Sequence, residues 1–254
     1  MRKRKYGHLI WNDKTLEELE QEAIEYIQKI PLKEDKVFVG FSGGKDSVVL
    51  LDLVKKAGIP FIAGYNVTGN DPKSVTMMVK TSYPEVNFIQ PKHTFFHLLK
   101  TNGLPTRLHR WCCRILKEGN DLGYSVRIMG IRAEEAWKRA ARGREDEYKG
   151  RYTYKPIFHW PEWAIWEYID KYNLVYPKDI YDAGFSRVGC VMCPFNLTGS
   201  GKPAQKRREL SKKHFPLMWK VHKRYAKEYY YMKEKTRGPW DKPFEEWYNN
   251  YWIN

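Results

Sequence analysis

The most informative stretch of the sequence reads KVFVGFSGGKDS, from Lys36 to Ser47. Its first half is a short apolar run rich in valine and phenylalanine, which is typical of a buried strand in a parallel sheet. The second half, Ser42–Ser47, contains two adjacent glycines and leads directly into the helical pattern of Val48–Ala57. Glycines let a backbone approach an anion closely, and the N–H groups at the start of a helix point at that anion. The stretch therefore predicts a strand, a phosphate-binding loop and a helix in succession.

The side chains of this loop suit the same role. Its two serine hydroxyls can donate to phosphate oxygens, and its lysine supplies a positive charge. Its aspartate is expected to orient the loop or a magnesium ion, because phosphate repels a lone carboxylate. The spacing differs from the P-loop pattern G-x-x-x-x-G-K-[ST], and a tight turn with exposed charge is the alternative interpretation. The candidate nucleotide-binding residues are Ser42, Gly43, Gly44, Lys45, Asp46 and Ser47, and Lys45 and Asp46 are also candidate catalytic residues.

Strand and helix patterns alternate along most of the chain. A helix in the first 35 residues is expected to end at Pro31, and further strands are expected at Phe61–Tyr65, Val86–Ile89 and Ser125–Gly130. Helical segments separate these strands, so we predict an α/β fold with a doubly wound, mostly parallel, Rossmann-like sheet. A basic, aromatic-rich helical region follows, and its tail, residues 238–254, is expected to fold back onto the body.

The amino-acid composition excludes several classes of protein. The chain has 254 residues, 42% of them hydrophobic, and 45 Lys and Arg against 30 Asp and Glu, a formal charge of +15. This composition excludes a wholly disordered chain, and a strongly basic chain favours a polyanionic partner such as a nucleotide or a nucleic acid. Apolar runs such as Ile59–Ala63 are far too short to span a membrane. No apolar run follows the basic N-terminus, so we expect a cytoplasmic protein without a membrane partner.

The four cysteines occur in two pairs. Cys112 and Cys113 are adjacent, and Cys190 and Cys193 form a C-x-x-C. In a reducing compartment they are expected to be ligands or nucleophiles rather than disulfides. Four thiolates suit a [4Fe–4S] cluster, while a zinc site and four structural thiols are the alternatives.

The SGGKDS loop resembles that of the PP-loop, or adenine nucleotide α-hydrolase-like, superfamily, whose loop binds the phosphates of ATP or of an adenylyl sulfate. The cysteine pairs resemble the cluster motif of the phosphoadenylyl sulfate (PAPS) and adenylyl sulfate (APS) reductase family. Three further stretches resemble that family: Gly130–Arg139, Pro156–Ile169 and Tyr181–Cys190. The resemblance covers about residues 36–195. It implies a nucleotide-binding domain with an iron–sulfur motif, preceded by an N-terminal helix in 1–35 and followed by a helical extension in 196–254.

The resemblance also implies further nucleotide contacts. Gly130 and Arg139 fall in the first matching stretch, as does Arg132, which is a candidate catalytic residue. Both arginines would lie just beyond a strand end, where open α/β sheets bind ligands, although surface arginines are the alternative. Thr68 and Gly69 occupy the place of the family's D-T-G segment, but Val67 replaces its aspartate.

One departure from the family shapes the functional expectation. Sulfonucleotide reductases attack the sulfate sulfur with a cysteine near the C-terminus, and this sequence has no cysteine after Cys193. We therefore expect an enzyme that uses ATP, releases pyrophosphate and transfers sulfur to a nucleic acid (tRNA or DNA) or a similar acceptor, with magnesium and a sulfur-donor protein. The alternatives are a PAPS or APS reductase that uses a partner thiol, and a non-catalytic nucleotide-binding or redox-sensing subunit.

Overall fold

A six-stranded sheet organises the protein, whose computed structural model describes residues 13–118 and 120–253. The strand order is β3-β2-β1-β4-β6-β5, and every neighbouring pair is parallel except β5 with β6. The strands are β1 (Val37–Gly40), β2 (Phe61–Asn66), β3 (Val86–Ile89), β4 (Val126–Met129), β5 (Glu145–Tyr148) and β6 (Arg151–Tyr154). The mostly parallel, Rossmann-like sheet predicted from the sequence is confirmed.

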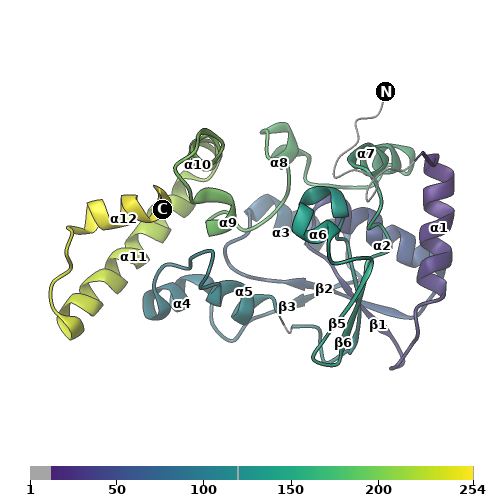
Figure 1. Ribbon diagram of the computed structural model, residues 1–254, viewed down its shortest axis with the longest axis horizontal. Coiled ribbons are helices and arrows are strands. Elements are labelled where there is room, and N and C mark those ends of the chain that lie inside the picture. Colours follow the sequence, from purple (N-terminus) through teal and green to yellow (C-terminus); the bar gives the residue numbers. More distant parts are fainter. Residues whose placement is uncertain (1–12, 119, 254) are drawn as a thin grey trace.

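Helices flank this sheet and extend beyond one end of it. Figure 1 shows α1 at one end of the molecule and α10, α11 and α12 gathered at the other. The helices are α1 (Leu16–Gln28), α2 (Lys45–Ala57), α3 (Lys73–Ser82), α4 (Phe95–Asn102), α5 (Trp111–Leu116), α6 (Trp137–Ala140), α7 (Glu162–Lys171), α8 (Lys178–Asp182), α9 (Pro194–Leu197), α10 (Lys202–His214), α11 (Pro216–Arg237) and α12 (Phe244–Ile253), with a 3₁₀ turn, η2, at Ala133–Glu135.

The antiparallel hairpin of β5 and β6 was not predicted from the sequence. Its outer strand reads EDEY and is mostly exposed, so it lacks the apolar run by which buried strands are found. At the other predicted positions the elements agree closely: the Val86–Ile89 strand has the predicted bounds, and the first helix ends at Gln28, just before Pro31.

The first hydrophobic core lies between the sheet and the helices α1, α2 and α7. The side chains of β1 from Val37 to Val39 are buried, as expected for a central parallel strand. Helix α1 presents Leu16, Leu19, Ala23 and Ile27 to this core at helical spacing. Thr15 and Glu18 form a capping box that satisfies the first N–H groups of α1. This core holds the start of α2, and hence the predicted phosphate loop, in place.

A second, strongly aromatic core joins the C-terminal helices to the middle of the chain. It takes residues from α4, α5, the C-x-x-C loop, α11 and α12. Phe244, Tyr248 and Trp252 of α12 are buried in it, so the tail folds back as predicted. The helical region expected from about 203 to 235 is divided at Phe215, and Pro216 begins α11 because proline fits the first turn of a helix. The second core therefore surrounds the segments that carry the cysteines.

No helix in the described residues is both long enough and apolar enough to cross a membrane.

We expect the second core to weaken in acid because of His222. This side chain is fully buried, its Nδ1 lies 2.9 Å from the Tyr248 hydroxyl, and the rings of Phe95 and Trp252 pack against it. Burial lowers the pKa of His222 to about 3 from its ordinary 6.5. Below pH 6.5 the unfolded chain therefore binds a proton on His222, whereas the folded chain leaves this imidazole neutral. The free energy of unfolding consequently falls as the pH decreases from 6.5 towards 3.

The measurement is the free energy of urea unfolding of the wild type and of His222→Phe between pH 7 and 4. Below pH 6.5 the free energy of unfolding of the wild type should fall relative to that of His222→Phe by up to about 1.4 kcal/mol per pH unit. The exposed His93→Phe, which removes a histidine outside the buried second core, serves as the control. A pH-independent difference for His222→Phe would show that the buried imidazole does not control acid stability.

Candidate functional site

The segment between β1 and α2 folds into a compact loop. The Gly44 carbonyl accepts hydrogen bonds from the Ser47 Oγ at 2.8 Å and from the backbone N–H groups of Ser47 and Val48 at 3.0 Å. The Ser42 N–H donates to the Ser47 Oγ at 3.2 Å. Gly43 has φ of +72°, and a Cβ there would lie 2.8 Å from Val75 of α3, so this position requires glycine. The loop is thereby held with the start of α2 facing the carboxyl ends of the strands.

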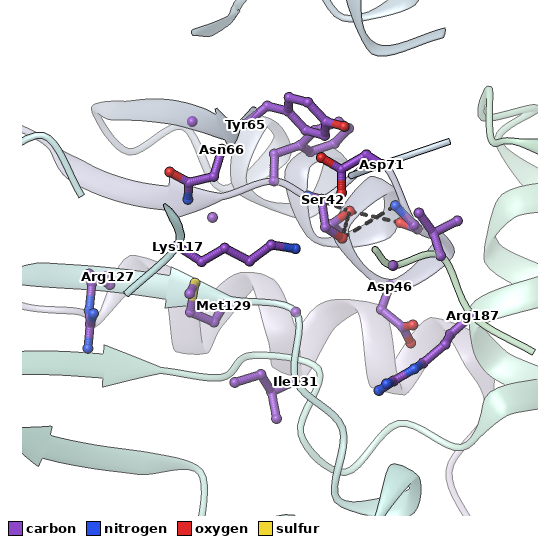
Figure 2. A pocket seen from close by; sticks show the side chains of 18 of the residues that line it. Ser42, Asp46, Tyr65, Asn66, Asp71, Lys117, Arg127, Met129, Ile131 and Arg187 are labelled. Carbon is purple, nitrogen blue, oxygen red and sulfur yellow. Dashed lines mark hydrogen bonds between the residues drawn. The ribbon is translucent and has the colours of Figure 1, made fainter. Parts of the chain in front are cut away.

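A cavity of about 310 Å³ lies beside this loop. Its walls come from the ends of β1, β2 and β4, so it opens where the chain leaves the central strand for neighbours on either side. Open α/β sheets bind ligands at such a switch point, and the volume suits a nucleotide. Figure 2 shows the side chains of Ser42, Asp46, Asp71 and Lys117, among others, around this cavity.

The sequence predictions divide into residues that line the cavity and residues that lie around it. Those that line it are Ser42, Gly44, Asp46, Ser47, Gly130 and Arg139. The Arg139 guanidinium also pairs with Glu135, which lines the same cavity. Gly43, Lys45, Thr68, Gly69 and Arg132 are not among the lining residues.

Lys45 is buried beside the loop rather than at the cavity wall. Its ammonium donates to the Ser186 carbonyl at 3.1 Å and lies 3.4 Å from Glu162 Oε1 and 3.7 Å from Asp46 Oδ2. Its backbone N–H donates to the Tyr181 hydroxyl at 3.0 Å. These contacts make Lys45 a link between the loop and the segment that leads to the C-x-x-C.

Arg132 lies behind Asp46. Its Nε donates to Asp46 Oδ1, and its Nη1 donates to Glu134 Oε2 at 2.9 Å and to the Trp160 carbonyl at 3.3 Å. The side chain is 3% exposed, so its donors are committed to the protein. Arg132 therefore orients the Asp46 carboxylate, which does line the cavity.

The four cysteines line one small pocket, with Lys117 beside them. The loop after β2 holds the C-x-x-C loop in place: the Asn70 carbonyl accepts from the Val191 N–H at 2.7 Å, and Asn70 Oδ1 accepts from the Met192 N–H at 3.1 Å. Thr68 Oγ1 lies 3.8 Å from Cys190 Sγ. Thr68 and Asn70 thus line the cysteine pocket.

The surroundings of the cysteines shift the pKa values of their thiols in opposite directions. Burial raises the pKa of Cys190 to about 11, although the Lys117 ammonium acts in the opposite direction. A hydrogen bond from Cys112 lowers the pKa of Cys113 to about 6. Among the described residues, no three His, Cys, Asp or Glu side chains converge as ligands of a single metal ion. Each cysteine of a [4Fe–4S] cluster binds a different iron, so four thiols around one pocket are a donor set that could hold a cluster, and four thiolates also suit zinc.

The profile of the phosphoadenosine phosphosulfate reductase domain matches residues 36–196. The chain belongs to this family. An uncharacterized protein of Methanocaldococcus jannaschii is 31% identical over 86% of the chain and 47% of its own length. The adenosine 5'-phosphosulfate reductase of Staphylococcus saprophyticus is 25% identical over 66% of the chain and 74% of its own length. The chain spans about half the length of the first two curated relatives that it matches.

The fold agrees with this assignment to the PAPS reductase family. A crystal structure of phosphoadenylyl-sulfate reductase from Candida auris, in a phosphate complex, superposes with a TM-score of 0.55 at 15% identity and covers 71% of the chain and 96% of that protein. The Staphylococcus saprophyticus relative is named as a reductase, and the likeness to the Candida auris protein shows a shared fold.

Sequence reasoning missed two cations of this PAPS reductase-family site. Lys117 lines both the cavity and the cysteine pocket, and its ammonium points into the cavity. The pKa of Lys117 is raised, chiefly by Cys190. Arg187 lines the cavity, is exposed, and makes no ion pair with any described residue. Both lie close to a cysteine motif in the sequence, but only the fold brings them to the phosphate loop.

We expect Gly130→Ala to weaken nucleotide binding without unfolding the protein. A Cβ at this position would lie 3.0 Å from the Asp46 carbonyl oxygen and 3.3 Å from the Ser47 nitrogen, both in the backbone of the phosphate loop. The loop must therefore shift, and we expect the Kd for ATP to rise about tenfold, which corresponds to about 1.4 kcal/mol. Calorimetric titration with ATP measures this change. Gly201→Ala is the control, since its Cβ would meet only Pro203 at 3.6 Å. Equal affinities for the two variants would contradict the predicted position of the nucleotide.

Proposed function

We propose that this PAPS reductase-family protein binds ATP in the cavity and activates an acceptor by adenylation for sulfur transfer, with its four cysteines holding a [4Fe–4S] cluster. The observation that carries the proposal is the Asp46 carboxylate, which faces the phosphate-binding cavity and is fixed from behind by Arg132.

Two carboxylates beside the loop suit a magnesium–ATP complex. Asp46 and Asp71 both line the cavity, and magnesium is commonly bound by one or two carboxylates together with substrate phosphates. Arg132 and Lys45 partly compensate the charge of Asp46, so this carboxylate would hold the ion in a fixed position. A magnesium ion there would neutralise part of the charge on the phosphates.

Different residues of the chain would then have different roles in adenylation. The phosphates would lie against Ser42, Gly44 and Ser47 of the loop, while Arg187 and Arg139 would stabilise the charge that develops on them. An oxygen of the acceptor attacks the α-phosphorus, a new P–O bond forms, and the bond to pyrophosphate breaks. Sulfide then attacks the activated carbon or phosphorus, the bond to AMP breaks, and AMP leaves with the oxygen. No net oxidation or reduction occurs.

The cysteine pocket supports a cluster that is held by protein alone. When bound, a [4Fe–4S] cluster with four thiolate ligands supplies a compact charged or redox-active group near the nucleotide. Cys112, Cys113, Cys190 and Cys193 would be its ligands, and Lys117 lies between it and the cavity. With all four thiols engaged, none of the 254 residues supplies a free thiolate for attack on a sulfonucleotide.

A second candidate is reduction of an adenylyl sulfate with a partner dithiol, which is favoured by the adenosine 5'-phosphosulfate reductases among the relatives. One thiolate of the partner would attack the sulfate sulfur, an S–S bond would form, and AMP would leave. The second thiol would then release sulfite, so that the dithiol is oxidised to a disulfide while the sulfate sulfur is reduced.

We expect pyrophosphate and AMP to form from ATP in the presence of magnesium, an RNA or DNA acceptor and sulfide, and Asp46→Asn to lower that rate at least about 100-fold. Asp170→Asn, an exposed change on α7, is the matched control and should act like wild type. Sulfite formation from adenylyl sulfate with a dithiol, without pyrophosphate formation from ATP, would support the reductase instead. Nucleotide binding without any product would support a non-catalytic subunit.

We expect the anaerobically purified protein to hold about four irons per chain and to absorb broadly near 400 nm. Cys113→Ser and Cys193→Ser should each lose most of the iron and the colour. Met192→Leu, a change of a buried residue between the two C-x-x-C cysteines, is the control and should keep both. One zinc per chain, or no metal, would contradict the proposed cluster.

A further inference from the structure

The outer face of α11 carries a row of four basic residues and one tyrosine. Its members follow one another at intervals of four, three, four and four residues, so they lie along one side of the helix. All of them are exposed, and the opposite side of the helix carries the buried residues Trp219, His222, Ala226 and Tyr230. We call this row the α11 stripe: Lys220, Arg224, Lys227, Tyr231 and Lys235.

The charge of the stripe is not required by the packing of the helix. Helices α10 and α11 together contain thirteen Lys and Arg but only three Glu. Some of these cations are structural: Arg207 donates to the Asn196 carbonyl, and Arg208 donates to three carbonyls, including that of Trp252. The three lysines of the stripe, in contrast, make no ion pair with any described residue.

The acidic residues beside the stripe only partly compensate it. Glu228 lies 3.5 Å from Arg224, but Glu228 is also paired with Lys100 of α4 at 2.9 Å. Glu234 lies near the far end of the row. Like charges three or four residues apart destabilise a helix, so the packing alone gives no reason for four cations in a row. The stripe therefore favours an anionic ligand.

The length of the stripe and its tyrosine indicate which class of anionic ligand it would bind. From Lys220 to Lys235 the helix rises about 22 Å, at about 1.5 Å per residue. A nucleic acid strand at about 3.4 Å per nucleotide would present about six phosphates over that length. Tyr231 lies within the row and is 44% exposed. The Lys227 ammonium lies 5.8 Å from the centroid of its ring and the Tyr230 ring packs against it, so the exposed part of the ring is what can meet a base. Stacking on such a ring requires an unpaired base, whereas a duplex keeps its bases covered.

We propose that the α11 stripe binds a single-stranded nucleic acid, with phosphates on its lysines and arginine and a base stacked on Tyr231. Helix α11 begins immediately after Phe215, which lines a small pocket together with Arg187 and Cys190. Arg187 also lines the nucleotide cavity. A strand bound along α11 towards its N-terminus therefore leads to the side of the cavity where the cysteines lie. Such binding deepens the proposed function, on which it rests only for the identity of the sulfur acceptor.

The experiment measures fluorescence anisotropy of labelled 20-nucleotide oligo(dT) and oligo(U) with the full chain, without ATP, at several salt concentrations. The stripe variant Lys220→Gln/Arg224→Gln/Lys227→Gln should bind at least about tenfold more weakly. The slope of log K against log salt should fall by about two, since each lost phosphate contact contributes about 0.7. Tyr231→Ala should weaken binding about tenfold with an unchanged salt slope.

The matched control is Lys29→Gln/Lys36→Gln/Lys80→Gln, which removes three exposed positive charges outside helices α10, α11 and α12 and should bind like wild type. Thermal melting verifies that all variants are folded. Binding of one or both oligonucleotides that depends on the stripe and on Tyr231 supports the proposal. Equal weakening by the control, equal or tighter binding of a 20-base-pair duplex, or equal competition by polyglutamate would overturn it. Because no turnover is needed, absence of pyrophosphate formation would refute the proposed function without affecting this result.

Discussion

The site depends on the hydrogen bonds that join Asn70 to the C-x-x-C loop. The Asn70 carbonyl and side-chain oxygen accept from the N–H groups of Val191 and Met192, which are far away in the sequence. Asn70 follows β2 of the first core, whereas Val191 and Met192 belong to the second. These hydrogen bonds connect the two cores, and Phe215 packs against both as well. The thiols lie beside the nucleotide cavity because this connection holds them there.

Buried charge pairs give the phosphate loop its shape. Lys45 and Arg132 direct their donors to Asp46 and to backbone carbonyls, so they fix the carboxylate and the loop rather than face the cavity. Breaking such a buried pair leaves an uncompensated charge, which is strongly destabilising. The cations that face the cavity are less constrained, and Arg187 has no charged partner among the described residues. The charged residues that stabilise the loop are thus different from the charged residues that face the cavity, although both kinds lie near the loop.

Much of the nucleotide site could be predicted because its signals are local. The strand, the two glycines and the helix of residues 36–57 determine their own geometry through backbone sterics and helix-end N–H groups. Lys45 and Arg132 show where such reasoning stops. Their residue types suit phosphate, but the orientation of a long side chain depends on which distant carbonyls and carboxylates surround it, here Ser186, Glu162 and Trp160.

The sequence by itself determined the parallel α/β sheet, the phosphate loop, the family and the pairing of the cysteines into two motifs, since each follows from apolar periodicity or from short motifs. Only the tertiary structure decided that Lys117 and Arg187 face the cavity and that the cysteines line a single pocket. It also decided that the aromatic tail closes the second core. Contacts between segments 70 or more residues apart, such as Lys117 with Cys190, arise from the packing of two cores, and no local pattern encodes them.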